Sequence, residues 1–134
     1  MHHSASDVAC AFRWADLAVD PEGELNTFGH VYGLATRRER RAGGSVCLPT
    51  LDMSLQRVGV WQALRMMTSG AAYALHQDSV LGPLTVGKQA DLIVVSADPL
   101  TVDPSTLDGL RVLSTVVGGR AEYCAPGAEA VCGP

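Results

Sequence analysis

The sequence lacks several patterns that mark specialised classes of protein. No run of apolar residues approaches the roughly 18 that a membrane-spanning helix needs. The formal net charge is −4, whereas a surface that binds nucleic acid carries an excess of basic residues. No glycine-rich segment resembles a phosphate-binding loop, and the first residues, MHHSASD, lack the basic and apolar regions of a secretory signal. We therefore expect a cytoplasmic protein that binds neither nucleic acid nor a membrane.

The cysteine spacing of metal-binding and redox motifs is also absent. The four cysteines, Cys10, Cys47, Cys124 and Cys132, include no CxxC motif. Because cytoplasmic thiols are generally kept reduced, we expect free thiols rather than a disulfide framework. The chain has 134 residues, 47% of them hydrophobic and 18% charged, which is enough for about one soluble globular domain with a real core.

The last third of the chain carries the clearest strand pattern. After a short opening strand and a Gly-Lys turn, residues 91–95 (DLIVV) are aliphatic beyond the first position, which predicts a strand covered on both faces. We expect Asp91 itself to make a structural hydrogen bond. Residues 112–117 predict the next strand, and Gly118-Gly119 can take the positive φ angles of a tight hairpin. Residues 120–123 return as an edge strand, so that 91–95, 110–117 and 120–123 form one antiparallel sheet.

Two helical regions precede this predicted sheet. Asn26 or Thr27 can cap the first, which ends in the basic run 37–41 and carries four residues at helical spacing, namely Phe28, Val31, Tyr32 and Ala35. The composition of residues 42–57 predicts a linker.

The second helical region extends from about Val58 to His76, and we expect it to pack near the sheet. Ser69 can cap a second short helix within it, and Met66 and Met67 are predicted to fill the core. The spacing predicts one buried stripe, formed by Trp61, Leu64, Thr68, Ala71 and Leu75.

The order of these segments resembles the C-terminal part of the metal-dependent amidohydrolase family, in the branch that acts on exocyclic amides and related carbon–nitrogen bonds. The resemblance rests on GKQADLIVV, VVGGR and QALRMMTSGAAYALHQDSVLG, and on NTFGHVYGLATRR, which is similar to the family pattern NPFxGIYAAVTRR. It spans roughly residues 9–123. It implies an α+β fold: a fragment of a (β/α)8 barrel (last strand and helices) in residues 1–80, antiparallel strands of the composite β-sandwich domain in residues 81–124, and a flexible tail at 125–134.

The resemblance implies one catalytic residue, Asp16. In the family the last barrel strand ends in Gly-Ser-Asp, and this Asp takes or relays a proton from the attacking water. In this chain Trp14-Ala15 stand where the family has Gly-Ser. Asp7, which follows a serine, is therefore an alternative. A further alternative is that Asp16 only ends a strand in solvent.

The family also implies a divalent metal, with zinc as the first candidate, which activates the water. Its usual HxH ligand pair is absent, since the histidines are His2, His3, His30 and His76. Neighbours on a strand point to opposite faces, so His2 and His3 cannot share a metal from a strand. We expect His30 to be partly buried at the surface and His76 to be exposed. We therefore expect no metal or other cofactor on this chain alone.

The resemblance thus implies that the full-length protein hydrolyses the carbon–nitrogen bond of a small amide-type substrate. We expect the isolated chain to be inactive and to depend on a homo-oligomer or a complementing chain. The alternative is a non-catalytic α+β interaction module that docks its sheet on a partner. Metal content, and an in-frame HxH motif encoded upstream of Met1, would distinguish the two.

Overall fold

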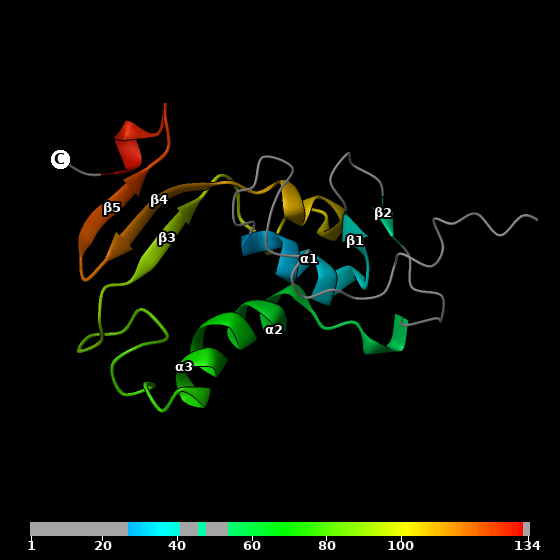
Figure 1. Cartoon of the computed structure of the whole chain (residues 1–134), viewed down its shortest axis with the longest axis horizontal. Coiled ribbons are helices and arrows are strands. Elements are labelled where there is room, and N and C mark those ends of the chain that lie inside the picture. The colour runs from blue at the N-terminus through cyan, green and yellow to red at the C-terminus, as the bar shows by residue number, and fades with distance from the viewer. Residues whose placement is uncertain (1–26, 41–45, 48–53, 133–134) are drawn as a thin grey trace, which may run out of the picture. The chain divides into compact units, whose positions relative to one another are not determined.

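The hairpin predicted from Gly118-Gly119 is present in the computed structural model, which describes residues 27–40, 46–47 and 54–132. Strands β3 (Leu92–Val95), β4 (Val112–Val117) and β5 (Arg120–Cys124) form one antiparallel sheet in that order (Figure 1). Val117 pairs with Arg120 across the two glycines, whose φ angles are +56° and +80°. Only glycine adopts such angles without a steric cost, which is why the turn forms at this point. The predicted sheet is confirmed.

The side chains of β3 are partly open to solvent, which corrects the prediction that both of its faces are covered. The order places β4 in the centre and leaves β3 and β5 at the two edges. Ile93 is 42% exposed and the other residues of β3 are half-buried. An unbroken aliphatic run shows that a strand favours burial, but it does not show that another element covers each face. The short opening strand is also wrong, because residues 81–86 form turns and bends.

The chain divides into two compact units. Unit 1 comprises residues 1–60 and 102–109, and unit 2 comprises residues 61–101 and 110–134. In unit 1, α1 (Thr27–Thr36) packs against η4, a 3-10 helix at Pro104–Gly109. Four side chains of these two elements form the core of unit 1, each at most 3% exposed: Phe28, Val31, Tyr32 and Leu107. The helical spacing predicted for the first three is confirmed.

Helix α1 ends before the basic run and not within it. The Thr36 hydroxyl donates a hydrogen bond to the Tyr32 carbonyl at 2.7 Å, and Arg37 then takes a left-handed conformation with φ of +55°. The chain continues as β1 (Glu39–Arg40), which pairs antiparallel with β2 (Val46–Cys47). The prediction that the helix ends within this basic run is therefore wrong, because the left-handed residue ends the helix first. The predicted linker includes β2 and a 3-10 turn, η2 (Ser54–Gln56).

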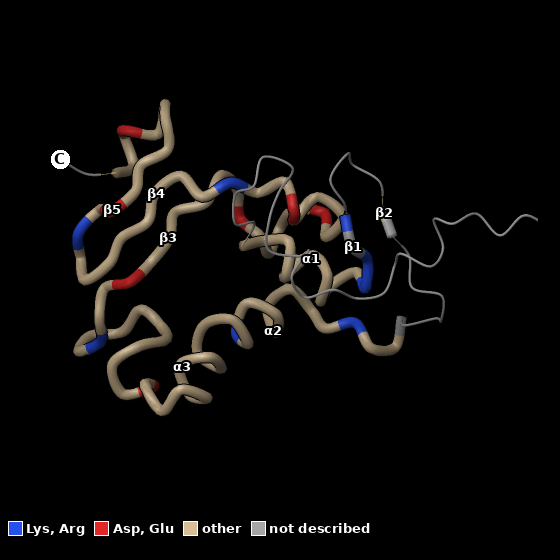
Figure 2. Tube along the Cα trace, in the orientation of Figure 1, with Lys and Arg blue, Asp and Glu red and all other residues tan. Residues whose placement is uncertain are grey.

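The second helical region lies in unit 2 and is continuous. Helix α2 (Val60–Arg65) runs through a π-helical turn, η3 (Met66–Gly70), into α3 (Ala71–Ala74). Ser69 does not cap α3, because Gly70 at the cap position is itself helical and no side chain bonds to the cap. Arg65 is the one charged residue from Val60 to Ala74, so these helices are almost free of charge in Figure 2.

The buried stripe predicted for this region is wrong. Ala63 and Ala72 are buried, whereas Trp61 is 61% exposed and Leu75 is 68% exposed. Met66, predicted to fill the core, is 53% exposed. Helical spacing identifies apolar positions, but it does not reveal whether another element covers them. Among the described residues of unit 2, the two alanines are the only fully buried hydrophobic side chains.

Candidate functional site

Asp16, the candidate catalytic residue, lies outside the described residues, and so does its alternative Asp7. The same holds for His2 and His3. Thr27, the first residue of α1, is the described residue nearest to Asp16 in the sequence. The structure therefore describes the helix that follows this segment in the sequence, and the catalytic role of Asp16 stays a prediction.

The two other histidines belong to different units. His30 lies on α1 in unit 1 and is half-buried, and His76 follows α3 in unit 2 and is exposed, with φ of +56°. Both are surface residues, as predicted. Within the part of the chain that the structure describes, no three His, Cys, Asp or Glu side chains lie close enough to hold a metal ion. These residues do not fit a divalent metal, whose catalytic sites typically need three protein ligands.

An ion pair fastens the segment after α1 to η4 in unit 1. Arg40 donates through Nε to the Asp108 carboxylate and through Nη2 to the Ser105 carbonyl, the latter at 3.2 Å. Its guanidinium carbon lies 5.6 Å from the centre of the Tyr32 ring, within the range of a cation–π contact. The hydrogen bond with Asp108, and then the charge of Asp108, raise the pKa of Arg40. Arg40 thus joins β1 to both elements that form the core of this unit.

Arg37 makes a second tie within unit 1. Its Nε donates to the Gln56 carbonyl at 2.7 Å, and its Nη2 donates to the same oxygen. The Val58 N–H then donates to the Leu34 carbonyl at 3.2 Å, which brings the chain after η2 alongside α1. Both arginine contacts were missed from the sequence. The partners of Arg37 and Arg40 lie 19 and 68 residues away along the chain, so no local pattern signals them.

Asp91 supports the hairpin turn of unit 2, as predicted. Its Oδ1 accepts a hydrogen bond from the Gly118 N–H at 2.7 Å. Beside it, the Gly119 N–H donates to the Ala90 carbonyl at 3.0 Å. The start of β3 is thereby tied to the turn between β4 and β5. The Asp91 carboxylate therefore has a structural role, and its hydrogen bond involves the backbone of the turn.

Lys88 closes the loop that leads from α3 to β3. Its Nζ donates to the Leu81 carbonyl at 2.9 Å and to the Asp78 carbonyl. The Gln89 N–H donates to the Val80 carbonyl at 2.9 Å across the same loop. The GKQAD segment thus uses its cation and its carboxylate to bind backbone groups. It is a scaffold for the sheet.

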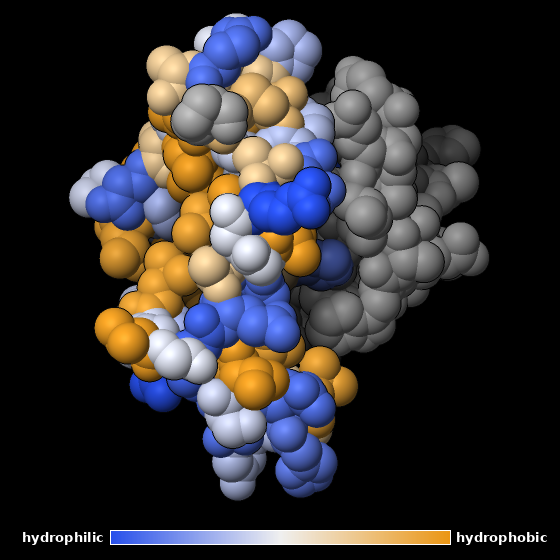
Figure 3. Space-filling view, turned by 90° about the vertical axis from the view of Figure 1, so that its left-hand side faces the viewer, coloured by the Kyte–Doolittle hydropathy of each residue, from blue (hydrophilic) through white to orange (hydrophobic). Residues whose placement is uncertain are grey.

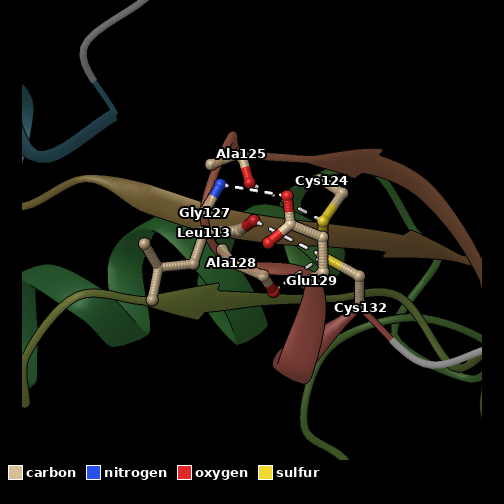
Figure 4. Close-up of a disulfide and its surroundings, with 7 residues drawn as sticks. All are labelled: Leu113, Cys124, Ala125, Gly127, Ala128, Glu129 and Cys132. Carbon is tan, nitrogen blue, oxygen red and sulfur yellow. Dashed lines mark hydrogen bonds between the residues drawn. A yellow bond between two sulfur atoms is a disulfide. The ribbon is translucent and has the colours of Figure 1, made fainter.

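A disulfide between Cys124 and Cys132 closes the segment after β5 (Figure 4). Their Cα atoms are 5.8 Å apart, a separation that disulfides commonly span. The expectation of free thiols is therefore wrong for this pair. A signal was present in the sequence, because the two cysteines lie eight residues apart on either side of Pro126-Gly127. A turn at that point brings the chain back on itself.

Comparison with known proteins gives consistent matches. The sequence profile of the Amidohydrolase family matches residues 17–123. A Bacillus subtilis (strain 168) protein named "Putative amidohydrolase YtcJ" is 32% identical over 79 residues, which are 59% of this chain and 13% of that protein. The "N-substituted formamide deformylase" of Arthrobacter pascens is 39% identical over 62 residues, which are 46% of this chain and 11% of that protein. The matched residues thus make up about an eighth of each relative's length. No solved structure shows a significant match.

Proposed function

This chain belongs to the amidohydrolase family, and we propose that it forms the C-terminal part of an enzyme that hydrolyses carbon–nitrogen bonds other than peptide bonds. The observation that carries the proposal is the family match, which covers both α1 and the three-stranded sheet. The name of one relative describes a deformylase of N-substituted formamides. From this name we take only a substrate class for the present chain, namely small amide-type compounds.

The architecture proposed for the chain is the end of a (β/α)8 barrel followed by strands of a β-sandwich. Residues 1–80 would form the barrel portion and residues 81–124 the sandwich strands. Two features of the structure support this architecture, although α3 and the sheet belong to the same compact unit. The helices α1, α2 and α3 all precede the sheet, and among the described residues no strand pairs with the outer edges of β3 and β5. A sheet with open edges can be completed by strands from elsewhere in a longer protein.

The proposed role of Asp16 is to take or relay the proton of the attacking water. The family match begins at Leu17, one residue after Asp16, and continues through the α1 segment that resembles the family pattern. General acid–base transfer of this kind contributes about 10²- to 10⁴-fold to a rate. The divalent metal of the family, with zinc as the first candidate, would be held by residues outside those that the structure describes.

The exposed apolar surface of unit 2 supports dependence on further polypeptide. Trp61, Tyr73 and Leu84 are 61%, 72% and 67% exposed. Figure 3 shows apolar side chains, in orange, open among hydrophilic ones on the face that it draws. Exposed apolar groups that gather on a surface mark interaction sites in soluble proteins. We propose that a complementing chain or a second copy covers this surface in the active enzyme.

A pair of matched variants tests the proposal. The chain would be produced joined to the N-terminal part of the proposed enzyme, and hydrolysis of an N-formyl amine would be measured in the presence of zinc. Asp16→Asn is expected to lower kcat by about 10²- to 10⁴-fold, and Asp7→Asn is expected to leave it unchanged. A loss confined to Asp7→Asn would move the role to that residue. If neither the parent nor the variants hydrolysed the amide, the non-catalytic α+β module that docks its sheet on a partner would be favoured.

A further inference from the structure

We propose that the Cys124–Cys132 disulfide is a reversible clasp, opened by thiol reductants, that holds residues 125–132 against the open end of the β4–β5 hairpin. The proposal does not depend on the catalytic function. It rests on where the two sulfur atoms lie, on how the segment between them is folded, and on how open the bond is to solvent.

The clasp joins the end of β5 to the segment that follows it, close to the start of β4. Cys124 is the last residue of β5 and pairs with Ser114 of β4, and the next residue, Ala125, donates its N–H to the Leu113 carbonyl at 2.8 Å. Cys132 follows the 3-10 helix η5 (Glu129–Val131), and its Sγ lies 3.9 Å from that same Leu113 oxygen. The disulfide therefore fixes η5 beside the start of β4, as Figure 4 shows.

The enclosed segment has hydrogen bonds of its own. The Gly127 N–H donates to Glu129 Oε1 at 3.1 Å, and the Ala128 N–H donates to the Ala125 carbonyl at 3.0 Å. Gly127 has φ of +80°, which glycine adopts freely, so the turn forms without strain. The Val131 N–H donates to the Ala128 carbonyl at 3.0 Å. These bonds keep the two cysteines near each other after reduction, so the disulfide can form again.

One feature makes the closed clasp sensitive to reductants. Cys124 is exposed and Cys132 is half-buried. Exposed disulfides are generally the labile ones.

Opening the clasp requires one equivalent of a small dithiol. A thiolate of the dithiol attacks Sγ of Cys124, the more exposed residue, and the S–S bond breaks with its electron pair leaving on Cys132. The second thiol of the reductant then displaces Cys124 from the mixed disulfide. The protein gains two electrons and two protons as two thiols, and the dithiol leaves as its cyclic disulfide. The Cys132 sulfur, 3.3 Å from the Ala128 carbonyl, then has an acceptor for its new S–H.

Alkylation of the full chain tests the state of the bond. Trypsin cleaves after Arg120 and no Lys or Arg follows, so both cysteines fall in the peptide 121–134. Without reductant, that peptide is expected to be unalkylated and lighter by two hydrogen atoms. Dithiothreitol in native buffer is expected to give the doubly alkylated peptide, and removal of dithiothreitol with addition of oxidised glutathione should restore the bond. Double alkylation before reduction, a link to Cys10 or Cys47, or resistance to dithiothreitol in native buffer would each overturn the proposal.

Amide hydrogen exchange tests whether the bond holds the segment. Reduction is expected to speed exchange at the Ala125 N–H on the order of tenfold or more, because the closed loop no longer restricts opening. The Gly118 N–H, bonded to Asp91 at the far end of the hairpin, is the internal control and is expected to be unchanged. The double variant Cys124→Ser/Cys132→Ser should show the faster exchange in both redox conditions, and Cys10→Ser/Cys47→Ser should behave as the parent. Equal exchange at Ala125 in oxidised and reduced parent protein would refute the clasp.

Discussion

Arg40 holds β1 to η4 and α1 through three contacts within unit 1. Replacement of this residue by alanine removes the ion pair with Asp108, the hydrogen bond to the Ser105 carbonyl and the contact with the Tyr32 ring. The Asp108 side chain is 9% exposed, but that of Arg40 is 40% exposed, so solvent screens the pair. We therefore assign the pair about 1 kcal/mol, near the upper end for surface ion pairs. The ring contact adds about 0.5 kcal/mol, and the carbonyl bond about 0.5 kcal/mol.

The expected loss for Arg40→Ala is thus about 2 kcal/mol in the free energy of unfolding of unit 1. Arg40→Lys is the matched control, because it keeps the charge. An ammonium cannot present the planar fork that binds Asp108 and Ser105 together, so about half of the loss should remain. The pKa of Arg40 is raised above its ordinary alkaline value, so its contribution is complete below that value and is lost only at still higher pH.

A double-mutant cycle with Asp108→Ala isolates the pair from the other contacts. Urea unfolding would be followed through NMR signals of α1, since this helix lies in unit 1. We expect a coupling energy of about 1 kcal/mol that decreases as salt concentration rises. Additive effects of the two substitutions, within about 0.3 kcal/mol, would refute the claim that this ion pair holds β1 to η4.

Three further predictions concern unit 2. Asp91→Ala should lower its stability by about 1 kcal/mol in thermal unfolding, because the Gly118 N–H loses its acceptor, and an unchanged melting temperature would contradict this. Ser114→Ala should leave stability unchanged or raise it by about 1 kcal/mol, and a clear loss would mean that the buried hydroxyl is bonded. The Glu129 carboxylate accepts hydrogen bonds from two backbone N–H groups, first its own and then that of Gly127, and these bonds lower the pKa of Glu129. The contribution of Glu129 to the turn is therefore complete above the ordinary glutamate pKa and is lost as the pH falls through the lowered value. Exchange protection of the Gly127 amide should accordingly fall at acidic pH in the parent and be independent of this titration in Glu129→Gln.

The hairpin could be predicted from the sequence because its determinants are local. Gly118-Gly119 allow the two positive φ angles, and the flanking runs contain residues that suit a pleated strand. The bond from Gly118 to Asp91 joins residues 27 apart, but the resemblance to the family supplied that structural role. Local geometry and a family pattern therefore sufficed for this part of the fold.

Burial was less predictable than secondary structure. Trp61 and Leu75 lie at helical spacing, yet both are largely exposed, and β3 is an aliphatic strand at a sheet edge. Periodicity identifies the face of a helix or strand that favours burial, but it does not identify the element that covers this face. In unit 1 the covering element is η4, which packs against α1 although the two are far apart in the sequence. For unit 2 we propose that it is another polypeptide.

The contacts of the arginines and the disulfide were missed for different reasons. Arg40 and Asp108 are separated by 68 residues, and only the folded chain brings them together. Cys124 and Cys132 are near in sequence and flank a Pro-Gly turn. The prediction of free thiols rested on the reducing environment of a cytoplasm and took no account of this spacing. Asp16 remains a prediction from the resemblance, since it lies outside the described residues.

We propose that this chain forms the C-terminal part of a carbon–nitrogen hydrolase whose metal ligands lie outside the described residues. Hydrolysis of an N-formyl amine would be measured in the presence of zinc, for the purified chain alone and for the chain combined with the N-terminal part of the proposed enzyme. No turnover is expected from the chain alone, and zinc-dependent turnover is expected from the combination. Turnover by the chain alone, together with stoichiometric zinc in its elemental analysis, would contradict the proposal.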